Sequence, residues 1–311
     1  MVAEVLLFVL GLLLCVILGS NNASVCFGTS TGSNDTNYSL AAGMAALGVF
    51  LGMLLEGYKL SGVVFSSGLG EVSVETMLIT LIVNLAMLLV ATYFRIPLSL
   101  SHSLIGSVVG VGVGTRVPVN WSYILTVVLS WVLTPLVGIL SAVLISMALI
   151  RVSHNIKNPL TLDYLYGRLT LILAFYTSYV LGANTIGLVT GLFVDYLGKQ
   201  LIYSFIFGLA AAFGIFFLGR GLAEVVGQGI VELSPLTGLV AQFGGAFTVH
   251  LFTQFGLPVA ITQALLGGVL GAGLAKRVVL VNTRTMTKIV AGWILAPLLG
   301  FVVSYIILCF L

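Results

Sequence analysis

Two short stretches decide the fold: I-P-L-S-L-S-H, from Ile96 to His102, and L-P-V-A-I-T-Q, from Leu257 to Gln263. Each carries proline at its second position, continues with hydroxyl, imidazole or amide side chains, and leads into a glycine-rich apolar run. Proline suits the first turn of a helix. Because these runs are short for a simple membrane crossing, we expect two half-helices whose N-termini lie at membrane depth.

The composition of the whole chain is that of a membrane protein. Of its 311 residues, 59% are hydrophobic and only 7% are charged, and the mean hydropathy is +1.21. Soluble domains contain about 25% charged residues, so a water-soluble particle of this size has too few charges to cover its surface. This excludes a soluble enzyme, a nucleic-acid-binding protein and a disordered chain. We expect an all-α chain whose helices span a lipid bilayer.

Ten apolar segments are expected, some of them too short or too rich in glycine to be simple spans. They lie at 5–19, 39–57, 75–94, 98–114, 121–150, 168–183, 201–219, 235–255, 258–275 and 288–311. The first is interpreted as a membrane segment and not as a signal peptide, because the residues before it carry Glu4 and no basic residue.

The chain contains a tandem repeat. W-V-L-T-P-L-V-G (Trp131–Gly138) matches W-I-L-A-P-L-L-G (Trp293–Gly300) at an offset of 162 residues. G-S-N-N (Gly19–Asn22) matches G-A-N-T (Gly182–Thr185) at 163, and the two proline stretches lie 161 apart. Matches in the same order at a nearly constant offset indicate a duplication. We expect a first repeat at 1–150, a linker at 151–167 and a second repeat at 168–311.

Basic residues predict the orientation of the two repeats. They gather in the central loop and in the loop before the last span, as Arg151, Lys157, Arg168, Lys276, Arg277, Arg284 and Lys288. Such loops face the cytoplasm. The loop at 114–122, which is equivalent to the last basic loop, has only Arg116 and lies one span away from the central loop, so it should face outward. We therefore expect inverted repeats with broken or re-entrant half-helices, about 10–12 membrane segments and both termini outside.

Polar residues form two clusters, each with a mate in the other repeat. The first holds Asn21, Asn22, Ser24, Thr29 and Ser30, with Asn184 and Thr185 as mates; the second holds Ser99, Ser101 and His102, with Thr262 and Gln263 as mates. Dense polar groups are costly in lipid unless they line a cavity, although a polar surface loop is the alternative for the first cluster. Helix N-termini bind anions, so the second cluster predicts an oxyanion site. A hydrogen-bonded core histidine is the alternative for His102.

Isolated ionisable residues carry weaker signals. Glu56 and Lys59 lie three residues apart and fit a pair at a helix end, although such an acid is also a candidate to carry a coupling proton. His250, alone in an apolar segment, is interpreted as a packed side chain. Sequence motifs for an enzyme, an ATP-driven pump or a metal site are missing, so we expect no catalytic residues and no cofactor.

The paired motifs resemble those of the inorganic phosphate transporter family, over nearly the whole chain. Besides the two proline stretches and the paired tryptophan motifs, they include G-S-N-N-A-S-V-C-F-G-T-S-T-G-S at residues 19–33. The resemblance implies a secondary transporter of inorganic phosphate, coupled to sodium or protons, with an inverted repeat. It also implies that the asparagine segments and the half-helix starts form the phosphate and cation sites.

The chain departs from the family pattern at its acidic positions. The family aspartate is Asn22 in the first repeat and Thr185 in the second, the second histidine is Gln263, and its preceding serine is Ala260. Hard cations prefer charged oxygens, so neutral Asn22 and Thr185 would hold sodium weakly. Protons or facilitated exchange are then alternatives. Sulfate permeases among the divergent relatives lack the aspartate in a similar way.

These observations predict an ion-coupled phosphate transporter that works by alternating access. The expected substrate-binding residues are Asn21, Thr29, Ser30, Ser99, Ser101, Asn184 and Thr262. The expected coupling-ion residues are Asn22, Ser24, Glu56, His102, Thr185 and Gln263, with sodium at Asn22 and Thr185 as one option. A sulfate permease of the same fold and a passive anion channel are the alternatives. The expected partners are the oxyanion, sodium or protons, and the bilayer; a homodimer is left open.

Overall fold

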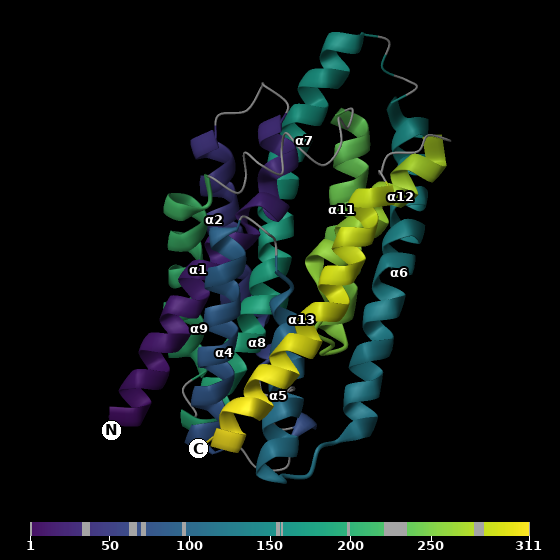
Figure 1. Ribbon diagram of the computed structural model, residues 1–311. Helices are drawn as coiled ribbons and strands as arrows, with labels where there is room; N and C mark the ends of the chain where they lie inside the picture. The colour runs from purple at the N-terminus through teal and green to yellow at the C-terminus, as the bar shows by residue number, and fades with distance from the viewer. Residues whose placement is uncertain are drawn as a thin grey trace.

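The protein is a bundle of long helices (Figure 1). The computed structural model describes residues 2–32, 38–61, 67–69, 73–94, 98–153, 156, 158–197, 200–220, 235–276 and 283–310. Across these residues the regular structure is helical, apart from one isolated bridge between Leu69 and Val119.

Within the described residues, α-helices of eleven or more residues follow one another in a first and a second half. In the first half they are α1 (Val2–Gly32), α2 (Tyr38–Glu56) with the short turn η1 (Gly57–Lys59), α4 (Val74–Tyr93), α5 (Leu100–Thr115) and α6 (Trp121–Ser153). In the second half they are α7 (Pro159–Leu181), the π-helical turn η2 (Gly182–Ile186), α8 (Gly187–Leu197), α9 (Gln200–Phe213), the π-helical turn η3 (Gly214–Leu218), α11 (Pro235–Gln254), α12 (Ile261–Lys276) and α13 (Thr283–Phe310).

The described part of the chain has eight helical stretches that are long and apolar enough to cross a bilayer, and two shorter apolar helices, α5 and α12. The expected multi-pass all-α fold is confirmed. Helix α6 ends at Ser153 and α7 begins at Pro159, so both helices extend into the stretch expected to be a linker.

The two short helices begin inside the bundle and run toward opposite ends of it (Figure 1). They start at Leu100 and Ile261. The expectation that proline occupies the first turn is wrong for α12, because Pro258 precedes that helix by three residues and its carbonyl accepts a hydrogen bond from Trp131 Nε1 at 2.9 Å. Pro97 lies outside the described residues.

The two asparagine segments are helical, so the alternative of a polar surface loop for the first cluster is wrong. Helix α1 continues through Asn21 and Asn22 to Gly32, and the equivalent residues of the second half form the π-helical turn η2. The helix continues because its polar side chains find acceptors within the bundle. The hydroxyl of Ser20 donates to the carbonyl of Leu218 at 2.9 Å, and Asn22 Nδ2 donates to the carbonyl of Leu18 at 3.2 Å. A π-helical turn inside a longer helix is frequent at functional sites.

Each short helix packs against the last long helix of the other half. Gly106 of α5 lies against the backbone carbonyl of Pro297 in α13, and Gly267 of α12 lies against that of Pro135 in α6. A Cβ atom at either glycine would overlap the carbonyl, so both positions require glycine. The two contacts are equivalent under the repeat, and α6 and α13 run in opposite directions in Figure 1.

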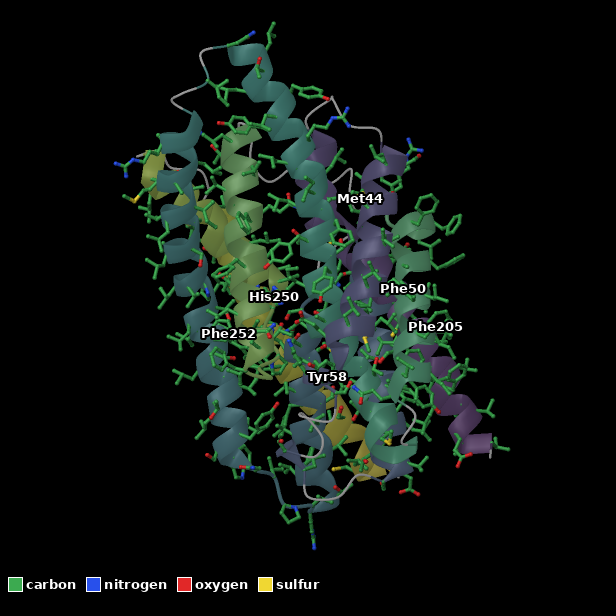
Figure 2. All side chains as sticks on the ribbon, turned by 180° about the vertical axis from the view of Figure 1, so that it is seen from behind. Met44, Phe50, Tyr58, Phe205, His250 and Phe252 are labelled. Carbon is green, nitrogen blue, oxygen red and sulfur yellow. The ribbon has the colours of Figure 1, made fainter. Side chains whose placement is uncertain are left out.

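Both termini lie at one end of the bundle in Figure 1, and the helix ends at Ser153 and Pro159 lie at the other. Side chains on the outside of the bundle include many large apolar groups (Figure 2). One contact between outer helices joins Phe50 of α2 to Phe205 of α9, with ring centroids 5.4 Å apart and an interplanar angle of 81°.

Candidate functional site

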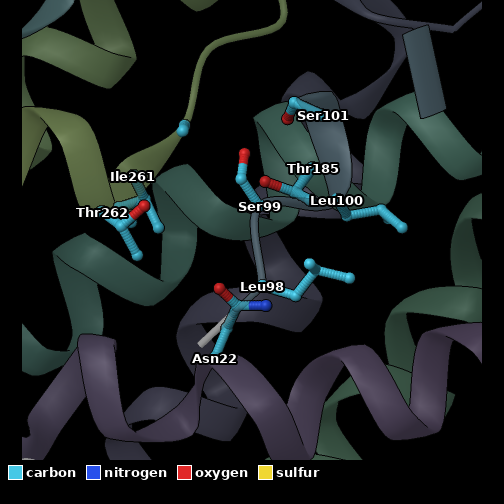
Figure 3. A pocket seen from close by; sticks show the side chains of 9 residues that line it. Asn22, Leu98, Ser99, Leu100, Ser101, Thr185, Ile261 and Thr262 are labelled. Carbon is cyan, nitrogen blue, oxygen red and sulfur yellow. The ribbon is translucent and has the colours of Figure 1, made fainter. Parts of the chain in front are cut away.

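A small polar pocket lies where the two short helices begin, as Figure 3 shows. Its walls come from both halves of the chain: from α1, from the residues that start α5, from η2 and from the start of α12. The lining residues are Asn22, Leu98, Ser99, Leu100, Ser101, Thr185, Ala260, Ile261 and Thr262. The structure therefore brings together residues that lie as far apart as 22 and 262 in the sequence.

The pocket is built to attract an anion without a basic side chain. Its nine lining residues include no charged residue, but hydroxyl groups come from Ser99, Ser101, Thr185 and Thr262. The first turns of α5 and α12 also face it. The N–H groups of a first turn have no acceptor within their own helix, and the helix dipole places positive partial charge there. Two such ends at one pocket favour an oxyanion.

The start of α5 is held by an aromatic stack behind the pocket. Nδ1 of His102 is hydrogen-bonded to the hydroxyl of Ser99, and the imidazole ring stacks on Trp131 with ring centroids 3.9 Å apart. Nε2 of His102 is buried and has no hydrogen-bond partner among the described residues. His102 is thus a buried side chain that orients Ser99, and it does not itself line the pocket.

Two hydrogen bonds run from the first half to the loop before α12, one from α6 and one from the start of α5. Trp131 Nε1 donates to the carbonyl of Pro258, and the hydroxyl of Ser101 donates to the carbonyl of Val259 at 3.3 Å. Both acceptors belong to the loop that leads into α12. A side chain of the first half therefore positions the backbone that opens the second short helix.

The two paired asparagines make equivalent contacts. Asn21 Nδ2 donates to the hydroxyl of Thr92 at 3.0 Å, and Asn184 Nδ2 donates to the hydroxyl of Thr253 at 2.9 Å. Each asparagine also reaches the loop before its own short helix: Asn21 Oδ1 accepts from the backbone N–H of Leu98, and Asn184 Nδ2 donates to the carbonyl of Leu257, both at 3.2 Å. These two residues brace the pocket from behind.

The structure sorts the expected site residues into four groups. Those that line the pocket are Asn22, Ser99, Ser101, Thr185 and Thr262. Those that are buried next to lining residues without lining it themselves are Asn21, His102, Asn184 and Gln263. Glu56 lies in a separate cluster with Lys59 and His250. The side chains of Ser24, Thr29 and Ser30 lie outside the described residues.

Sequence reasoning missed the two threonines that hold the paired asparagines. Thr92 and Thr253 lie 161 residues apart, which is the offset of the proline stretches. That shared offset was the signal that could have found them. The interpretation of His250 as a packed side chain also missed its contact with Glu56, at 3.1 Å between His250 Nε2 and Glu56 Oε2.

Comparison with known proteins places the chain in a family. Residues 18–304 match the family described as the phosphate transporter family. The chain therefore belongs to this family, whose members are membrane transporters and not enzymes.

Similar full-length proteins agree with this assignment. A Methanocaldococcus jannaschii protein named "Putative phosphate permease" is 28% identical over 298 residues, which cover 94% of this chain and 93% of that protein. The sulfate permease CysP of Bacillus subtilis is 28% identical over 303 residues, covering 93% of this chain and 83% of that protein. A solved structure named "The sodium-dependent phosphate transporter" has the same fold, with a TM-score of 0.82 at 24% identity over 99% of this chain and 98% of that one.

Proposed function

We propose that this member of the phosphate transporter family is a secondary transporter that carries inorganic phosphate by alternating access. The observation that carries the proposal is the pocket of Figure 3, which is lined from both halves of the chain and by two helix starts. A site shared between two halves opens to either side of the membrane when one half rocks against the other. The pocket has room for little more than a water molecule, so an oxyanion requires that movement in order to enter.

Within the pocket, each group takes a role that suits its chemistry. The hydroxyls of Ser99 and Thr262, the hydroxyl of Ser101 once it turns from the carbonyl of Val259, and the backbone N–H groups of the two first turns hold the anion. Asn21 and Asn184 position the backbone behind it. Thr29 and Ser30 remain candidates for anion contacts on the strength of the family motif alone.

For the coupling ion, two options remain within the proposal. Oxygen atoms of Asn22 and Thr185, both pocket residues, suit a weakly held sodium ion, with Ser24 and Gln263 as further candidates from the sequence. A proton is the second option, carried by His102 or Glu56. The similar protein of known structure is named as sodium-dependent, which favours testing sodium first.

The proposal includes inverted repeats, with both termini outside and the central loop in the cytoplasm. Three observations support it: the equivalent glycine contacts of α5 and α12, the opposite directions of α6 and α13, and the termini at one end of the bundle (Figure 1). The basic residues of the central loop favour the cytoplasmic side for the other end.

Sulfate is the second candidate substrate, because the pocket lining has no carboxylate among the described residues. Monohydrogen phosphate carries a P–OH donor that a carboxylate would accept, whereas sulfate has no such donor. Hydroxyl and backbone N–H groups suit both anions. A similar protein of Bacillus subtilis is named a sulfate permease.

The test is uptake of radiolabelled phosphate and of radiolabelled sulfate into proteoliposomes that contain the purified protein. We expect saturable phosphate uptake and exchange against internal phosphate, with sodium and pH varied independently to identify the coupling ion. Each anion is then competed with the other. Sulfate uptake that phosphate does not inhibit would reverse the substrate order, and single-channel currents without exchange would replace the carrier by a channel.

A further inference from the structure

A second polar cluster lies where α2 and η1 meet α7 and α11, and it joins the two halves of the chain. Its centre is the carboxylate of Glu56. Oε1 accepts a hydrogen bond from the hydroxyl of Tyr179 at 2.9 Å, and Oε2 accepts from Lys59 Nζ at 3.0 Å and from Gln254 Nε2 at 2.9 Å. The imidazole Nε2 of His250 lies 3.1 Å from the same Oε2. Glu56 and Lys59 belong to the first half, and the other three residues belong to the second.

The cluster lies between the two ends of the bundle. Figure 2 shows His250 and Tyr58 between the two ends of the bundle. Glu56 lies two positions before Tyr58 in the sequence. The side chains of Glu56 and His250 are only 19% and 26% exposed. Ionisable groups at membrane depth are costly and mark ion pathways or proton relays. A structural helix-end pair does not require a histidine from the opposite half.

The ligand that fits this cluster is a proton. Both oxygens of Glu56 already accept hydrogen bonds, and the ammonium group of Lys59 lies 3.0 Å away, so no free carboxylate oxygen faces an empty space that a metal cation would fill. An imidazole ring, by contrast, can gain a proton and then donates from both of its nitrogens. The titratable or charged groups that face His250 are Glu56 and Lys59 from α2 and η1, and Tyr176 and Tyr179 from α7. A proton on His250 changes its contact with Glu56 from a hydrogen bond to an ion pair.

The cluster is connected to the pocket through one turn of α11. Thr253 lies between His250 and Gln254 in the sequence, and its hydroxyl accepts the hydrogen bond from Asn184. Asn184 directly precedes Thr185, which lines the pocket. Any shift of α11 against Glu56 therefore moves the residue that braces the pocket. Such a continuous chain of hydrogen bonds and helix is a physical route for coupling.

We propose that Glu56 and His250 form a proton-binding site that links the relative position of the two halves to pH. The inference rests on the proposed transport function and assigns one of its coupling steps. A protonated His250 holds Glu56 of the first half and stabilises the closed arrangement seen here. Loss of the proton to solvent weakens this contact and allows the halves to separate.

The experiment compares wild-type protein with His250→Gln in proteoliposomes. Glutamine keeps a hydrogen-bond donor for Glu56 but takes up no proton. Initial uptake of radiolabelled phosphate and sulfate is measured as the external pH is lowered by one unit at fixed internal pH. We expect the wild-type rate to change several-fold, up to about tenfold, and the H250Q rate to change little. Phosphate titrates identically in both samples, so a difference between them belongs to the protein.

The matched control is His154→Gln, the same substitution at the histidine of the central loop, which should keep the wild-type pH response. Glu56→Gln should lose the response, because His250 then faces no carboxylate. An H250Q protein with the full wild-type response contradicts the proposal. If H250Q does not transport, the number of protons taken up on phosphate binding is measured by calorimetry in two buffers of different ionisation heat. Equal proton uptake in H250Q and wild type also contradicts the proposal. Wild-type protein that carries neither anion contradicts the transport function itself.

Discussion

The starts of α5 and α12 have the same architecture but different chemistry. Both follow a proline-containing stretch of sequence, both point their first turn at the pocket, and both pack a glycine onto a proline carbonyl of the opposite half. The start of α5 contributes two pocket hydroxyls, from Ser99 and Ser101, and a histidine behind them. The start of α12 contributes one, from Thr262, and has Ala260 where α5 has Ser99.

The shared glycine contacts reflect what helix packing requires, and the unequal hydroxyl groups reflect what the proposed substrate requires. Glycine contacts are set by backbone packing, and an equivalent contact occurs in each half. The proposed function accounts for the unequal hydroxyl groups, because a single anion in a shared pocket needs only one full set of donors. Substitutions at equivalent positions should therefore act equally on stability and unequally on affinity.

The largest effect is expected from Gly106→Ala and Gly267→Ala, which test the shared architecture. The added Cβ atom meets a backbone carbonyl in each case, and backbone cannot move aside as a flexible side chain does. We expect each variant to lose about 3 kcal/mol or more of stability, measured as thermal unfolding of the purified protein in detergent. Gly292→Ala, whose Cβ meets no atom within 4 Å, is the control. Unequal losses at the two glycines would break the equivalence of the halves.

Next in size is Asn22→Asp, which adds a carboxylate to the pocket. The new group accepts the P–OH of phosphate but faces the unprotonated oxygens of sulfate. We expect uptake of sulfate to fall about 100-fold relative to phosphate, equivalent to about 3 kcal/mol, and sodium to stimulate phosphate uptake more strongly than in wild type. An unchanged sodium response would remove Asn22 from the coupling-ion site.

A smaller effect is expected from Ser101→Ala at the start of α5. The substitution removes one pocket hydroxyl and its bond to the carbonyl of Val259, so the KM for the transported anion should rise about tenfold, as expected for one hydrogen bond to a charged group. Ser107→Ala removes a hydroxyl from the same helix away from the pocket lining and should leave KM unchanged. A wild-type KM for S101A would exclude the half-helix site.

The smallest effect is expected from Ala260→Ser, which gives the start of α12 the hydroxyl that Ser99 provides in α5. If the donor set is already complete, the KM should change less than about threefold, equivalent to about 0.6 kcal/mol. A strong gain in affinity would show that both halves contribute donors equally. Uptake at several anion concentrations distinguishes the two outcomes.

Much of the architecture and of the pocket could be predicted from sequence because the chain is a repeat. Asn22 and Thr185 could be identified because they occupy equivalent positions in the matched motifs, and the same holds for Ser101 and Thr262. Backbone conformation was predicted less well: the polar run after Gly19 suggests a loop, but acceptors from distant helices keep α1 intact. Such acceptors are tertiary contacts that no local pattern contains.

The pairing of Glu56 with His250 was beyond sequence reasoning for a related reason. The two residues lie 194 positions apart, and at the offsets of 161 to 163 neither has an ionisable counterpart: Glu56 meets Phe217, Leu218 or Gly219, and His250 meets Met87, Leu88 or Leu89. None of these residues repeats the chemistry, so the duplication gives no signal. The packing of α2 and of α11 against α7 brings the two side chains together.

Each short helix packs against the last long helix of the other half, and this arrangement has a consequence for synthesis. When the ribosome has completed the first 153 residues, the glycine face of α5 has not yet met α13, because that helix lies much later in the chain. Until α13 is made, that face of α5 lacks the partner it has in the folded protein. A chain that lacks α13 leaves the glycine face of α5 without its partner, whereas α12 still packs against α6.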